Sequence, residues 1–172
     1  MRIIVVSDTH GSYDRLYKIV MSNIQTADAF IHLGDCVEEC KNLISNFPNL
    51  AARFYFVKGN CDFGSDAPAF KIIDIIPGHR IFAAHGDRYG VDFDTNIIVK
   101  AAREQGCDIV LFGHTHVRFC SYEDGVYILN PGSASRPRDG KPASYGFIDF
   151  TPAGIVTNNV SITWFLILLY AV

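Results

Sequence analysis

Seven side chains that could bind metal ions each follow a short apolar stretch of the sequence. The set mixes oxygen and imidazole ligands, which suits Mn²⁺, Fe, Ni²⁺ or Zn²⁺, whereas Ca²⁺ would prefer a site made only of oxygen ligands. Four of the six histidines of the chain belong to the set. The seven residues are Asp8, His10, Asp35, Asn60, His85, His114 and His116. They predict a metal site, provided that the fold brings them to one place.

Taken alone, most of these motifs have a simpler interpretation. Asp8 with His10 is typical of a turn cap beside a solvated histidine, and Asn60 is typical of a turn. The segment Gly113–His116 is more specific. Its two histidines would point to one face in a strand, or could diverge toward two metals in a loop. For the whole set, the alternative is a polar cavity satisfied by water. So many buried titratable groups need a compensating charge, which favours metal ions.

The elements that would position these residues alternate between strands and helices in the first part of the chain. Apolar runs rich in β-branched residues predict buried strands at 2–7, 29–33, 54–57 and 108–112. Helices are predicted after Ser12, carrying Leu16, Ile19, Val20 and Ile24, and over 40–47 and 92–105. A hairpin is predicted for 70–84, and further short strands follow to the end. This order predicts an α/β domain with a mixed or double sheet.

The strand ends are the places where the seven residues would meet. Parallel strands that end together would bring them to one rim of the sheet, which is where ligands bind in α/β folds. Glycines stand beside most of them and permit tight turns and a close approach of the backbone to a ligand.

Length, charge and cysteine content set the wider limits. The 172 residues predict a single domain, 1–172, and the net charge of −3 provides no basic field that would recruit nucleic acid. No signal peptide is expected, because the first apolar run is too short for one. Five cysteines without a CxxC pair favour free thiols in the cytoplasm. The atypical apolar tail, 162–172, is shorter than the roughly 20 residues of a membrane-spanning helix.

The order of the motifs resembles the signature of the calcineurin-like metallophosphoesterases. The matching motifs are Asp8-x-His10, Gly34-Asp35, Gly59-Asn60-x-Asp62, His85-Gly86 and Gly113-His114-x-His116. The short chain and its Asn130–Ser133 segment resemble the small YfcE-type phosphodiesterases of that superfamily. The resemblance implies two facing mixed β-sheets flanked by helices, a four-layer sandwich. It extends from Asp8 to about Phe150.

The resemblance also implies a division of the ligands between two divalent metal ions. Asp8, His10 and His116 would hold the first ion. Asn60, His85 and His114 would hold the second, and Asp35 would bridge both. Manganese is the first expectation, with nickel, iron, zinc or magnesium as alternatives. A hydroxide held between two metals would attack phosphorus in line, so that no protein nucleophile is needed. The amide of Asn60 could also donate to a phosphate oxygen.

Three further positions near the motifs bear on the chemistry. Cys61 stands where many larger relatives carry a histidine that resembles a general acid, and we expect a packed, inert thiol there rather than a nucleophile. Asp87 replaces a histidine of small relatives, and we expect it at the rim rather than on a metal. Asp62 either orients a ligand or caps a turn.

The expected function is hydrolysis of small phosphodiesters. One alternative is a scaffold with little or no activity, since a retromer subunit of this fold has lost key ligands. Another is a nuclease or a phosphatase that acts on a different phosphoester. We expect no strong binding of nucleic acid and no membrane association. The apolar tail and the aromatic content favour a homo-oligomer, either a dimer or a tetramer.

Overall fold

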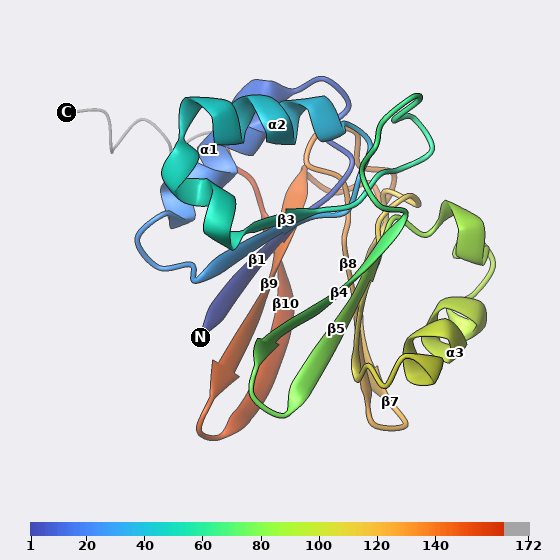
Figure 1. The fold of residues 1–172 in the computed structure, drawn as a ribbon. Helices are drawn as coiled ribbons and strands as arrows, with labels where there is room; N and C mark the ends of the chain where they lie inside the picture. Colours follow the sequence, from blue (N-terminus) through green and yellow to red (C-terminus); the bar gives the residue numbers. More distant parts are fainter. Residues whose placement is uncertain (164–172) are drawn as a thin grey trace.

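Two five-stranded sheets make up the centre of the molecule in the computed structural model, which describes residues 1–163 (Figure 1). The first sheet has the spatial order β10 (Gly154–Ser161), β9 (Ser144–Thr151), β1 (Arg2–Val6), β2 (Ala29–His32), β3 (Phe54–Phe56). The second has the order β4 (Phe70–Ile76), β5 (His79–Ala84), β6 (Ile109–Leu111), β8 (Val126–Pro131), β7 (Arg118–Glu123). Residues 164–172, most of the predicted apolar tail, lie outside the described residues.

Both sheets are mixed, and each has a parallel centre. Strands β1, β2 and β3 run parallel in the first sheet, and β5, β6 and β8 run parallel in the second. The strands toward the edges are antiparallel, as in the hairpins of β4 with β5 and of β9 with β10. The carboxyl ends of the parallel strands therefore gather at one edge of each sheet.

The helices cover the outer faces of the two sheets. The helices α1 (Tyr13–Asn23) and α2 (Val37–Asn46) pack on the first sheet, and α3 (Asn96–Glu104) packs on the second (Figure 1). Short 3₁₀ helices follow α2 at Pro48–Arg53 and β5 at Asp87–Tyr89. The result is a sandwich of four layers, which confirms the α/β fold class and the two facing sheets that were predicted.

Alternation along β1 shows how the sequence builds these layers. Ile3 and Val5 face the second sheet, where they pack in one core with residues such as Ile81 and Leu111. Ile4 and Val6 point the opposite way, into the core under α1 and α2. Successive side chains of a strand lie on opposite faces, so a continuous apolar run is needed when both faces are buried.

Three local predictions were wrong in detail. The helix α2 begins at Val37, three residues before the predicted start, because the carboxylate of Asp62 accepts the Val37 N–H at 2.7 Å and caps the helix from another loop. The helix α3 begins only at Asn96, since Asp94 accepts the Asn96 N–H and the preceding residues form turns. Ile24 lies just beyond α1.

Among the described residues, no helix has both the length and the apolar character needed to cross a lipid bilayer.

The core between the sheets predicts how much one buried side chain contributes to stability. Replacing Ile81, which is fully buried there, by alanine should lower the free energy of unfolding by about 2–5 kcal/mol, because it removes buried methyl groups and leaves a cavity. Urea denaturation followed by circular dichroism measures the change. Ile97→Ala, at a position 59% exposed on α3, is the control and should change stability by less than about 1 kcal/mol.

Candidate metal centre

The seven predicted residues all lie in loops at the shared carboxyl edge of the two sheets. Each loop follows a parallel strand: β1, β2 and β3 in the first sheet, β5 and β6 in the second. An unbroken series of polar side-chain contacts of 3.8 Å or less joins all seven residues. In order, it links Asp8, His116, His10, Asp35, His85, Asn60 and His114. The structure therefore brings together every residue that the sequence pattern selected.

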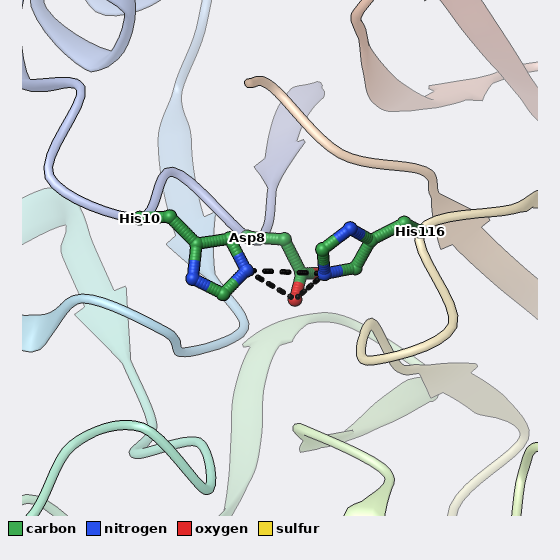
Figure 2. Close-up of side chains that lie close together, drawn as sticks. All are labelled: Asp8, His10 and His116. Carbon is green, nitrogen blue, oxygen red and sulfur yellow. Dashed lines mark hydrogen bonds and ion pairs between the residues drawn. The ribbon is translucent and has the colours of Figure 1, made fainter. Parts of the chain in front are cut away.

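One cluster is formed by Asp8, His10 and His116. Figure 2 shows the two imidazole rings pointing toward each other with the carboxylate of Asp8 beside the gap between them. His116 Nε2 lies 3.1 Å from Asp8 Oδ1 and 3.1 Å from His10 Nε2. Ligand atoms that share a cation at about 2.1 Å lie roughly 3–3.5 Å from one another. The third distance, from His10 Nε2 to Asp8 Oδ1, is 3.9 Å, which is still below the roughly 4.2 Å between two such ligands on opposite sides of an ion. One ion could therefore contact all three side chains.

A second cluster surrounds the amide oxygen of Asn60. His85 Nε2 lies 3.1 Å from this oxygen, and His114 Nδ1 lies 3.0 Å from it. The ring of His85 is fully buried, whereas Asn60 is exposed and His114 is partly exposed. The second cluster therefore opens to solvent more than the first.

Asp35 lies between the two clusters and presents one carboxylate oxygen to each. Asp35 Oδ2 is 3.8 Å from His10 Nε2, and Asp35 Oδ1 is 3.5 Å from His85 Nε2. The carboxylate is also held in place, since Oδ1 accepts the Cys61 N–H at 2.8 Å. This is the arrangement of a carboxylate that can bridge two ions.

In each of these histidines one ring nitrogen faces the cluster, and the other, here called the outer nitrogen, points away from it. The hydrogen bond of the outer nitrogen determines which ring atom faces the cluster. His116 Nδ1–H donates to the carbonyl of Arg136 at 2.6 Å, and His85 Nδ1–H donates to the carbonyl of Leu33 at 2.8 Å. In a neutral ring the second nitrogen is then an acceptor. The Nε2 lone pairs of these histidines consequently face other acceptors, namely Asp8 Oδ1 and Asn60 Oδ1.

An unpartnered oxygen supports the same interpretation of the first cluster. Asp8 is fully buried, and its Oδ1 atom has no hydrogen-bond partner. A buried acceptor without a donor is costly unless a cation compensates it. In the metal-free chain, the nearby Asp8 carboxylate raises the pKa of His116, so a proton competes for the position that a cation would take. The residues present therefore fit a metal ion.

The backbone of the ligands is strained. Five of the seven residues have positive φ values of 45–67°, and among the described non-glycine residues only Asp124 shares this conformation. The left-handed region costs L-residues free energy and is common at functional sites, where surrounding contacts fix it. The five residues are Asp8, His10, Asp35, His114 and His116.

Glycines allow the loops to approach each other at the site. A Cβ atom at Gly113 would lie 1.9 Å from Ser7 Oγ, and one at Gly34 would lie 2.4 Å from the backbone nitrogen of Gly59. Both distances are far below contact distance. The glycine of the Gly-His-x-His motif is thus required for the two sheets to meet.

Comparison with known proteins agrees with this geometry. A family model described as the calcineurin-like phosphoesterase superfamily domain matches residues 1–152. The chain belongs to the calcineurin-like phosphoesterase superfamily. The resemblance inferred from the motifs is confirmed, and with it membership of a metal-dependent family of phosphoester hydrolases.

Relatives and solved structures support the same assignment. YsnB of Bacillus subtilis, named as a probable metallophosphoesterase, is 31% identical over 150 residues, which cover 86% of this chain and 83% of YsnB. The phosphodiesterase YfcE of Escherichia coli is 26% identical, with 92% of this chain and 93% of YfcE covered. A crystal structure of a predicted phosphoesterase from Streptococcus pneumoniae has a TM-score of 0.74 and 26% identity, and it covers 92% of this chain and 97% of its own.

Within this phosphoesterase domain, Asp62 holds the backbone of the site. Its carboxylate accepts the N–H groups of Asp35 at 2.9 Å, Val37 at 2.7 Å and Gly59 at 2.8 Å. The structure supports both roles considered for Asp62: it caps the start of α2 and the turn at Gly59, and it holds the backbone of the candidate ligand Asp35.

Cys61 is exposed, so the expectation of a packed thiol was wrong. Partial burial of the sulfur atom and the neighbouring carboxylate of Asp35 raise the pKa of Cys61 to about 11. The side chain is therefore a neutral thiol near pH 7, which agrees with the expected lack of nucleophilic reactivity.

A buried polar chain behind the first cluster was missed by sequence reasoning. His32 Nδ1 accepts the Gly34 N–H at 3.2 Å, so Nε2–H donates to Thr9 Oγ1, also at 3.2 Å, and the Thr9 hydroxyl donates to Glu39. Thr9 lies between the candidate ligands Asp8 and His10 in the sequence. This series of hydrogen bonds therefore fixes the loop that carries both ligands. Only the burial of His32 within a strand hinted at this role.

Burial of His32 predicts a pH dependence of stability. Desolvation lowers the pKa of His32 from 6.5 to about 4. Between these two pKa values, His32 is protonated in the unfolded chain but neutral in the folded chain. The free energy of unfolding therefore decreases as the pH drops from about 6.5 to 4. The shift corresponds to a loss of roughly 3 kcal/mol.

Urea unfolding of metal-free protein between pH 7.5 and 4.5 measures this loss. His32→Gln keeps a hydrogen-bonding side chain but does not titrate, so its stability should decline less steeply. Parallel profiles for the two proteins would contradict the assignment to His32.

Proposed function

We propose that this protein is a phosphodiesterase that uses two divalent metal ions to hydrolyse small phosphodiesters. Manganese is the first choice, with nickel, iron, zinc or magnesium as alternatives. The ligands of the first ion would be Asp8, His10 and His116, those of the second Asn60, His85 and His114, and Asp35 would bind both.

The observation that carries the proposal is that acceptor atoms face each other in two adjoining clusters. His116 Nε2 faces Asp8 Oδ1, and His85 Nε2 faces the amide oxygen of Asn60. Such pairs repel unless a proton or a cation lies between them. Because the two oxygens of Asp35 point to different clusters, the geometry favours two ions over one.

Two bound ions would neutralise the charge of the phosphate and supply a hydroxide for in-line attack on phosphorus. The chain itself would orient the substrate. The exposed amide of Asn60 can bind an ion through its oxygen while its NH₂ group donates to a phosphate oxygen. With a thiol at Cys61 in place of an acidic imidazole, the enzyme would favour diesters with good leaving groups, such as aryl esters.

The charge of the chain favours small substrates over nucleic acid. The net charge is −3, and affinity for nucleic acid depends strongly on contacts from basic side chains to phosphates. The intact ligand set favours an enzyme over a scaffold. Rates with a diester, a monoester, a cyclic nucleotide and single-stranded DNA would distinguish the proposed activity from that of a phosphatase or a nuclease.

Removal and return of metal should control activity. Protein stripped with a chelator should not hydrolyse bis-p-nitrophenyl phosphate, and Mn²⁺ should restore turnover at two ions per chain, measured by plasma mass spectrometry. Asp35→Asn should lower the rate by more than about 100-fold, because loss of even an indirect partner of a metal ligand costs 10–100-fold.

Asp87→Asn is the matched control, since Asp87 belongs to none of the contacts that join the seven residues. It should retain most of the wild-type rate. Turnover that persists without metal would contradict the proposed chemistry. A chain that binds metal but hydrolyses nothing would favour the scaffold.

We also propose that the chain forms a dimer or a tetramer. Phe63 and Phe93 are each more than 90% exposed, and solvent contact with apolar side chains of this size is unfavourable. Light scattering coupled to gel filtration should give a mass of two or four chains of 19.1 kDa. A single-chain mass at micromolar concentration would contradict this proposal.

A further inference from the structure

The outer nitrogens of three histidines at the site have different kinds of partner. Those of His85 and His116 donate to backbone carbonyls, at 2.8 Å and 2.6 Å. The outer nitrogen of His114 instead lies 3.0 Å from a carboxylate oxygen of Asp92, a residue that neither the motif nor the ligand clusters include. His114 is thus the one histidine of these three that is oriented by another side chain.

The fold holds Asp92 in a short loop between β5 and α3. The neighbouring Val91 is buried and packs on Gly86, where an added Cβ would come within 2.7 Å of a Val91 methyl group. The Phe93 N–H donates to the Gly90 carbonyl at 3.0 Å and closes a turn around Asp92. Asp92 therefore reaches His114 from a backbone that is anchored on both sides.

The exposure of His114 explains why it would need such a partner. Its side chain is 24% exposed, whereas those of His85 and His116 are 0% and 4% exposed and are confined by packing. Its backbone has a φ of 67°, in the strained left-handed region. Without Asp92, little would determine which of the two ring nitrogens faces Asn60.

We infer that Asp92 is a positioning residue that prepares His114 to bind the second metal ion. A carboxylate accepts the Nε2–H of His114, so the proton stays on Nε2 and the Nδ1 lone pair points toward the amide oxygen of Asn60, 3.0 Å away. Two acceptors then face each other across the position of the ion. The inference rests on the proposed role of His114 as a ligand.

The test compares Mn²⁺ binding by wild-type protein, Asp92→Ala, Asp92→Asn and Asp94→Asn, by calorimetry and by metal content after equilibrium dialysis. Asp92→Ala should weaken the binding of one of the two ions by about 10–100-fold and leave the other unchanged. Asp92→Asn keeps an oxygen that can accept the Nε2–H of His114, so its loss of Mn²⁺ affinity should be smaller than that of Asp92→Ala. Asp94→Asn removes the same charge from the same loop and should bind as wild type does.

A second readout reports the tautomer directly. Imidazole nitrogen spectra of the Zn²⁺-loaded protein should show the His114 proton on Nε2 in wild type and a changed Nε2–H signal in Asp92→Ala. Asp92→Ala with two ions bound at wild-type affinity would overturn the inference, and so would an equal loss of affinity in Asp94→Asn. Wild-type protein that binds fewer than two ions would instead refute the proposed metal centre, so the two failures are distinguishable.

Discussion

The close approach of the two sheets at their carboxyl edges is the constraint on which the site depends. Gly113 follows β6 and lies directly against Ser7, which follows β1 in the other sheet, at a distance that leaves no room for a Cβ atom. This approach lets the carboxylate of Asp8 accept the His114 N–H at 3.1 Å. One carboxylate therefore joins the loops of both sheets, and ligands from each sheet meet around it. A bulkier residue at 113 would separate them.

The same edge concentrates backbone strain. A non-glycine residue in the left-handed region costs roughly 1 kcal/mol or more, so five such ligands cost on the order of 5 kcal/mol, a large part of a domain's net stability of about 5–15 kcal/mol. Hydrogen bonds from Ser133 and Ser135 to the Asp8 carbonyl offset part of this cost. An ion that binds only the folded chain would offset more. Binding of a metal ion at this edge would therefore be coupled to folding.

The positions of the candidate ligands could be predicted from the sequence, whereas the hydrogen bonds that hold their loops in place could not. Residues such as Asp35 and His85 could be located because each directly follows a short apolar run, and parallel strands end at a common edge. The start of α2 could not be predicted, because its cap is Asp62, 25 residues away along the chain. The hydrogen-bonded link from His32 through Thr9 to Glu39 could not be predicted either, since Thr9 is more than 20 residues from both partners along the chain. Local patterns do not encode such contacts.

The two clusters differ in burial, and this difference suggests different roles for the two ions. Asp8 is fully buried and His116 is 4% exposed, so an ion bound there would be enclosed by protein. Asn60 and His114 face solvent, so an ion bound between them would meet the substrate first. In each cluster one histidine donates its Nδ1–H to a backbone carbonyl, His116 in the enclosed cluster and His85 in the open one. The Nε2 atom of His114 in the open cluster lies 3.0 Å from a carboxylate oxygen of Asp92 instead, so a side chain on a neighbouring loop can orient this solvent-facing ligand.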